Sequence, residues 1–172
     1  MKKILVCIYI INLFSLSLWA QRHMESLGRG VVAIYKSTKT CYISWRYLAS
    51  DPSSIGFNIY KSTGGATATK LNTSVITATT DYIDANFDAT KSNSYFVKPV
   101  INGVEGNASR TYTLPANSSI KTYISLPLQS YNKTYSTVHV YVGDLDGDGE
   151  YDYVVKRFPK DSTLHVMLEA YN

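Results

Sequence analysis

The chain is poor in cysteine, and this scarcity excludes a disulfide framework. Only two cysteines occur among 172 residues, and Cys7 lies in an apolar segment at the N-terminus. If this segment is removed on export, the mature chain keeps Cys41 alone and cannot form an internal disulfide, even in an oxidising compartment. Cys41 shares a predicted strand face with Trp45, so we expect a buried and inert thiol.

Clusters of basic residues are also absent. The formal net charge is +4, and removal of Lys2 and Lys3 with the N-terminal segment leaves 15 basic and 13 acidic side chains, a charge of +2. This balance does not support nucleic acid as a partner. We expect a monomer.

The N-terminal segment has the pattern of a secretory signal peptide. Two lysines precede an apolar run from Ile4 to about Trp19, and Ala20 offers a cleavage point. We therefore predict that residues 1–20 are removed and that the protein is secreted, to the extracellular space or the periplasm, with no membrane attachment afterwards. The alternative is an uncleaved membrane anchor, for which the run is short and interrupted by one asparagine and two serines.

No helical periodicity is sustained anywhere, and the composition favours β-structure. The chain holds 15 tyrosines against 5 phenylalanines, which suits strands with one face in water. Short alternating segments are bounded by glycine, proline and small polar residues. The expected strands are Val31–Lys36, Cys41–Leu48, Gly56–Ser62, Thr80–Asp84, Ser94–Ile101 and Arg110–Leu114.

Alternation within these strands predicts a two-sheet sandwich over residues 22–115. Trp45 is expected to anchor the core, together with Cys41, Ile43 and Tyr47 on the same face of its strand. The facing sheet is expected to contribute Phe57, Ile59, Tyr95, Val97 and Pro99. The strand pattern resembles a fibronectin type III module.

A second region begins after Pro115. Residues 116–172 supply too few strands for an independent domain. The chain then stops within a segment, Leu164 to Tyr171, that has a strand pattern without a following turn. We interpret the sequence as a truncated reading frame.

The second region contains the strongest chemical motif of the chain. Acidic residues alternate around two glycines from Asp144 to Asp152. Ca²⁺ takes six to eight oxygen ligands, and residues spaced by two in a tight loop can point toward a common centre while glycine permits left-handed backbone. We predict Ca²⁺ as the cofactor, bound by Asp144, Asp146, Asp148 and Asp152 and by the backbone carbonyl of Glu150.

The context of this motif differs from that of an EF-hand. The twelfth loop position, counted from Asp144, is Val155 and not glutamate, and the flanking residues are β-branched and aromatic. The loop is therefore expected to join two strands. The alternative is a polar hairpin turn with solvated acids, since Asp-Gly is a common turn dipeptide.

Four blocks, taken in order, resemble the family 11 rhamnogalacturonan lyases, which are polysaccharide lyases. They are Arg22-His-Met-Glu-Ser-Leu-Gly-Arg-Gly-Val-Val-Ala33, Ser44-Trp-Arg-Tyr-Leu-Ala-Ser-Asp-Pro52, Phe57-Asn-Ile-Tyr-Lys61 and Val142-Gly-Asp-Leu-Asp-Gly-Asp-Gly-Glu-Tyr-Asp152. The resemblance implies a small N-terminal β-sandwich followed by a large β-propeller, of which residues 116–172 would be an incomplete first blade. It also implies calcium ions that hold the blade loops.

The implied activity is cleavage of the rhamnose-galacturonate backbone of pectin by β-elimination, with rhamnogalacturonan I as the polysaccharide partner. Family members are several-fold longer, so no catalytic residue or substrate ligand can be named here, and the chain alone is expected to be inactive. His139 and His165 are not expected to be catalytic. The alternative is a non-catalytic, secreted β-sandwich that binds carbohydrate or serves as a spacer.

Overall fold

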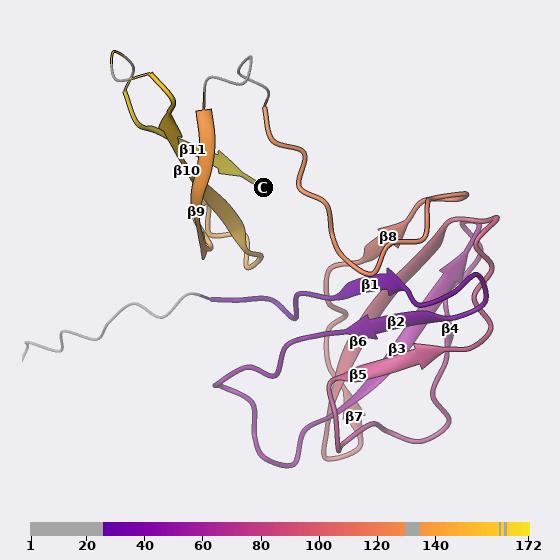
Figure 1. Ribbon diagram of the computed structural model, residues 1–172. Coiled ribbons are helices and arrows are strands. Elements are labelled where there is room, and N and C mark those ends of the chain that lie inside the picture. The colour runs from indigo at the N-terminus through magenta and orange to yellow at the C-terminus, as the bar shows by residue number, and fades with distance from the viewer. Residues whose placement is uncertain (1–25, 130–134, 162, 164) are drawn as a thin grey trace, which may run out of the picture.

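The computed structural model describes residues 26–129, 135–161, 163 and 165–172, and this part of the chain is built from strands and connecting segments (Figure 1). The expectation of an all-β protein is confirmed. None of the described residues forms a helix with the length and apolar character that a bilayer crossing requires. The predicted signal peptide lies outside the described residues.

The first eight strands form two facing sheets (Figure 1). One sheet has the order β1-β2-β5, and the other has the order β4-β3-β6-β7, with β8 also paired to β6. The strands are β1 (Val32–Tyr35), β2 (Cys41–Ser44), β3 (Gly56–Thr63), β4 (Thr69–Lys70), β5 (Asp81–Asp84), β6 (Asn93–Ile101), β7 (Val104–Glu105) and β8 (Tyr112–Leu114). Every named pairing is antiparallel.

The core lies between these sheets and follows the alternation of the sequence. Ile43 on β2 and Ile59 on β3 are fully buried, one from each sheet. Trp45 packs its ring edge-on against Phe57, with 5.5 Å between ring centroids. Burial of each such side chain stabilises the fold by about 1.5–3 kcal/mol. The predicted core roles of Cys41, Ile43, Trp45, Phe57, Ile59, Tyr95 and Val97 are confirmed.

The prediction for Tyr47 was wrong, because β2 ends at Ser44 and Tyr47 is 53% exposed. After Trp45 the chain leaves the sheet and turns, and the Leu48 amide donates to Asp51 Oδ2 at 2.7 Å. The Tyr47 hydroxyl donates to the Pro52 carbonyl at 3.1 Å on the surface. The sequence keeps its alternating pattern past Ser44, but this local turn takes the backbone out of the sheet.

Pro99 was also predicted to face the core, but it is only half-buried and Val100 is buried instead. The chain after β7 returns over Pro99, and the Gly106 amide donates to the Pro99 carbonyl at 2.8 Å. The two shortest strands, β4 and β7, were not predicted. Each has two residues, too few to show a period.

A third sheet follows the connecting segment and is separate from the two sheets of the sandwich (Figure 1). It has the order β11-β10-β9, with β9 (Tyr135–Gly143), β10 (Asp152–Pro159) and β11 (Met167–Tyr171). Both strand flanks expected around the aspartate motif are confirmed, and β9 pairs antiparallel with β10. The motif is therefore a hairpin connection.

Candidate metal centre

The aspartate loop joins β9 to β10 and begins and ends on paired residues. Gly143 lies opposite Asp152 in the register, so the two ends of the loop are held side by side. Gly147 and Gly149 have φ values of +78° and +87°, in the left-handed region that favours glycine. The two glycines therefore let the backbone reverse within a few residues.

Three of the predicted ligands come together in this loop. Carboxylate oxygens of Asp144, Asp146 and Asp152 lie within 4.8 Å of one another. Asp152 is buried, Asp144 is half-buried and Asp146 is exposed, so the group extends from the interior to the surface.

Backbone amides of the loop fix the orientation of these carboxylates. Asp144 accepts from the amides of Gly147, at 2.7 Å, and Gly149, at 3.0 Å. Asp152 accepts from the Leu145 amide at 2.7 Å. These bonds place oxygen atoms at fixed positions around a common centre.

The structure does not bring Asp148 into this group. Its carboxylate accepts from the Glu150 amide at 2.8 Å and pairs with the Arg110 guanidinium, which comes from the sandwich. The hydrogen bond from the Glu150 amide is the larger cause, and the pair with Arg110 the next, that hold the pKa of the Asp148 carboxyl below its usual range.

The side chain of Glu150 also points to the sandwich, where Arg46 Nη1 lies 3.3 Å from its Oε2. The predicted role of this residue concerns its backbone carbonyl, and position seven of a calcium loop commonly contributes a carbonyl. The ion pair therefore keeps the Glu150 carboxylate on the sandwich side of the loop.

The donor set fits a hard divalent cation. Among the described residues, no ion pair is found for Asp144, Asp146 or Asp152, although their carboxylates are close together and Asp152 is buried. Like charges at this spacing repel one another, and a buried carboxylate without a countercharge is unfavourable. An oxygen-preferring cation of charge two would offset both effects, and Ca²⁺ accepts the flexible geometry of such a loop.

Sequence reasoning missed the two arginines that contact the loop. Arg46 follows a strand in the first half of the chain, and Arg110 precedes β8, so both are distant in sequence from the motif. Nothing in local spacing indicates either contact. His139 and His165, which were not expected to be catalytic, are both exposed.

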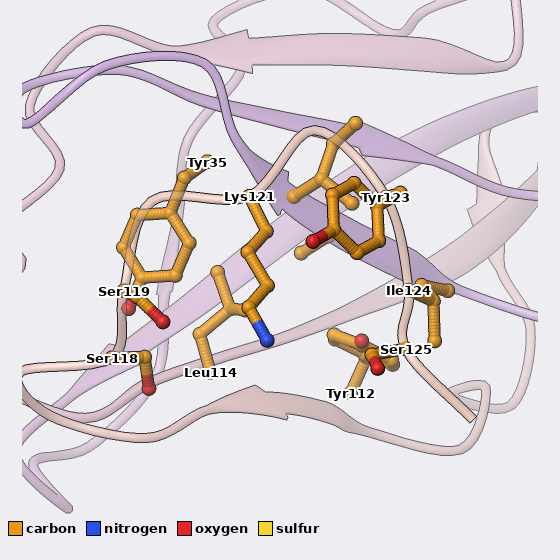
Figure 2. A pocket seen from close by; sticks show the side chains of 11 residues that line it. Tyr35, Tyr112, Leu114, Ser118, Ser119, Lys121, Tyr123, Ile124 and Ser125 are labelled. Carbon is orange, nitrogen blue, oxygen red and sulfur yellow. The ribbon is translucent and has the colours of Figure 1, made fainter. Parts of the chain in front are cut away.

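A separate cavity of about 390 Å³ lies beside the sandwich, between β1, β8 and the segment after Pro115 (Figure 2). Figure 2 shows the Lys121 side chain extending into this space, with the Tyr123 ring beside it. Tyr112 and three serine hydroxyls also line it, at Ser118, Ser119 and Ser125. Aromatic rings with hydroxyl and ammonium groups are a chemical environment suited to a polar, ring-shaped ligand.

Comparison with known proteins points to one family. The family model described as the rhamnogalacturonan I lyase beta-sheet domain matches residues 22–114. The chain is 35% identical over 171 residues to the rhamnogalacturonan endolyase YesW of Bacillus subtilis, a match that covers 88% of this chain and 25% of that protein. It is 27% identical over 164 residues to the rhamnogalacturonan exolyase YesX of the same organism, covering 88% of this chain and 26% of that protein.

A solved structure, the rhamnogalacturonan lyase PL11 of Bacillus licheniformis, matches with a TM-score of 0.66 and 33% identity. This match covers 88% of the chain and 27% of that structure. The chain thus spans about a quarter of the length of the relatives it matches.

Proposed function

Because the chain belongs to the rhamnogalacturonan I lyase family, we propose that it is part of a secreted lyase that cleaves the rhamnose-galacturonate backbone of pectin by β-elimination. The observation that carries the proposal is the similarity to rhamnogalacturonan lyases over 88% of the chain, from the sandwich through the aspartate loop. In this reaction a base removes the proton at C5 of galacturonate as the glycosidic oxygen leaves.

The part of the lyase that this chain supplies is structural. We propose that the sheet of β9, β10 and β11 belongs to the first blade of a propeller and that the chain is inactive by itself. The strand division of the sandwich supports a fibronectin type III-like module, because β1, β2 and β5 share one sheet while β3, β6 and β8 share the other. In immunoglobulin-like sandwiches strands A, B and E likewise share one sheet, whereas C, F and G share the other.

Calcium is proposed as the cofactor of the aspartate loop. Asp144, Asp146 and Asp152 would hold it with their carboxylates, and it would supply the positive charge that these three groups lack. Asp148 and the Glu150 carbonyl are further proposed ligands. Calorimetric titration of the full chain with CaCl₂ tests this assignment, with Asp144→Asn expected to weaken binding and Asp161→Asn, outside the loop, expected to leave it unchanged.

The lyase assignment is tested on the native product. An antibody against residues 30–114 is expected to detect a protein several times larger than this chain in cultures grown on rhamnogalacturonan, and that protein is expected to release unsaturated galacturonate, which absorbs ultraviolet light. The purified 172-residue chain is expected to release none. A native product of the size of residues 21–172, without lyase activity, would overturn the proposal.

The cavity in Figure 2 favours a second candidate function, a non-catalytic carbohydrate-binding module. Its lining combines Tyr112 and Tyr123 with the Lys121 ammonium, which lies 5.9 Å from the Tyr123 ring centroid. Rhamnogalacturonan oligosaccharides are expected to shift the amide resonances of this segment if the cavity binds them. The Tyr123→Ala variant should then abolish the shift, whereas Tyr60→Ala should not, because Tyr60 does not line the cavity.

A further inference from the structure

The sandwich and the aspartate loop meet at a close backbone contact. The Gly28 amide donates to the Gly149 carbonyl at 2.6 Å. A Cβ atom on Gly149 would lie 2.9 Å from the Gly28 nitrogen and 3.1 Å from the Ser26 carbonyl oxygen, so no side chain fits there. Gly149 therefore permits both the left-handed backbone of the loop and its contact with the chain before β1.

Arg46 closes this contact from the sandwich side. Its Nη1 donates to the carbonyls of Gly28 and Gly149, each at 3.2 Å, so one guanidinium binds both chain segments of the contact. The same atom lies 3.3 Å from Glu150 Oε2, and the guanidinium carbon lies 4.1 Å from the centre of the Tyr151 ring. Three consecutive loop residues are thus held by one side chain.

The Arg46 side chain reaches the loop by passing close to Gly30, where only a glycine leaves room for it. A Cβ atom on Gly30 would lie 2.3 Å from the Arg46 guanidinium carbon, and Gly30 has a φ of +53°. The Arg46 amide donates to the Arg29 carbonyl at 2.6 Å, which fixes the backbone from which the side chain extends. Contacts within the sandwich therefore direct the arginine to the loop.

We propose that Arg46 is a positioning residue that presets the cation loop from the sandwich. It binds the backbone carbonyl of Gly149 and holds the Glu150 carboxylate away from the centre of the loop. Glu150, at position seven of the loop, is then left to offer its backbone carbonyl to the cation. The inference rests on the proposed calcium function of the loop. In this arrangement the sandwich orders the metal centre and is more than a spacer.

Three expectations follow from this role. Arg46→Met keeps the length of the aliphatic stem but removes every bond to the loop, and calcium affinity should fall on the order of tenfold, as for other residues that orient metal ligands. Arg46→Lys keeps the charge and one donor and should restore part of the affinity. Gly30→Ala, which displaces the guanidinium without changing it, should resemble Arg46→Met.

The experiment combines two measurements on the full chain. Calorimetry with CaCl₂ gives the affinity, and amide hydrogen exchange without calcium reports the protection of residues 144–152. Lys98→Met is the matched control, since Lys98 pairs with Glu105 at 3.2 Å within the sandwich and does not contact the loop. Near-ultraviolet circular dichroism of Trp45, buried against Phe57, verifies that each variant keeps its sandwich.

The result expected is a protected loop in the wild type and the control, faster exchange in Arg46→Met, and weaker calcium binding by that variant with an intact sandwich. Equal loop exchange and equal affinity in wild type and Arg46→Met would overturn the role of Arg46. Absence of calcium binding by the wild type would instead overturn the calcium assignment. If Arg46→Met fails to fold, the partial recovery expected of Arg46→Lys decides the question, and no difference between Arg46→Lys and wild type overturns the proposal.

Discussion

Lys61 and Asp84 form an ion pair of 2.6 Å inside the sandwich, although they belong to strands of different sheets. Both side chains are buried, at 8% and 3% exposure. The Tyr95 hydroxyl donates to the same Asp84 oxygen at 2.9 Å, and Lys61 Nζ donates to the Asn86 carbonyl at 2.9 Å. The pair and its hydrogen bonds therefore connect the two layers through the core.

Loss of one partner of this pair should be costly. Lys61→Met leaves the Asp84 carboxylate buried without its countercharge, and the free energy of unfolding should fall by about 3–5 kcal/mol. Urea unfolding followed by circular dichroism measures the change. Lys91→Met, which removes an exposed pair with Asp88, is the control and should leave the transition in place. A Lys61→Met protein as stable as the control would contradict a structural role for the pair.

The ion pair of Arg29 and Asp51 predicts a pH dependence. Two guanidinium nitrogens donate to Asp51 at 2.5 and 2.7 Å, and the arginine, with the Leu48 amide, lowers the pKa of this carboxyl. A lowered pKa in the folded state means that the contribution to stability is complete above the unfolded-state value of about 4 and is lost as the pH falls through the folded-state value.

Asp51→Asn tests this sign. Urea unfolding of both proteins from pH 6 to pH 2 should show the wild type more stable by a constant amount at the upper end and progressively less so at the acid end. A gap that stays constant down to pH 2 would show that Asp51 is not the group that titrates.

Arg110 pairs with Asp148, which is a proposed calcium ligand. The guanidinium pairs with the carboxylate that the loop pattern predicts as a ligand, so binding through Asp148 must break this exposed pair. Arg110→Met should therefore raise calcium affinity a few-fold, while Asp148→Asn should lower it, both by calorimetry. If neither change alters affinity, Asp148 lies outside the ligand set.

The two loop glycines provide a matched pair of substitutions. Alanine at either position adopts left-handed backbone at a cost of about 1–2 kcal/mol. A Cβ on Gly147 meets no atom within 4 Å, whereas a Cβ on Gly149 collides with Gly28. Gly149→Ala should therefore lower calcium affinity more than Gly147→Ala and should alone speed the hydrogen exchange of the Gly28 amide. Equal effects would show that the contact with Gly28 does not support the loop.

Much of the sandwich could be predicted because its strands alternate. Ile43, Trp45, Phe57, Ile59, Tyr95 and Val97 occupy the core positions that the period of two assigns to them. The period fails at Tyr47, where a side chain from Asp51 captures a backbone amide, and at Pro99, where the chain after β7 folds back. Such local hydrogen bonds have no signature in hydrophobic alternation.

The loop could be predicted as a hairpin, but its surroundings could not. Spacing identified the acidic residues, the β-branched and aromatic flanks predicted strands on either side, and the structure gathers Asp144, Asp146 and Asp152. The partners of Asp148 and Glu150 are supplied by Arg110 and Arg46, which only the fold brings near. Contacts between residues so distant in sequence depend on how the sandwich packs against the aspartate loop, and they leave no local sequence pattern.

The contact between Arg46 and the Gly149 carbonyl joins residues 103 positions apart, and this separation has a kinetic consequence. Contacts distant in sequence carry the largest entropy of chain closure, whereas the β9–β10 hairpin is local. During synthesis the sandwich emerges first, and domains generally fold in that order. The loop therefore meets an anchor that has already formed, and a segment that leaves the ribosome later is shaped by the sandwich that folds before it.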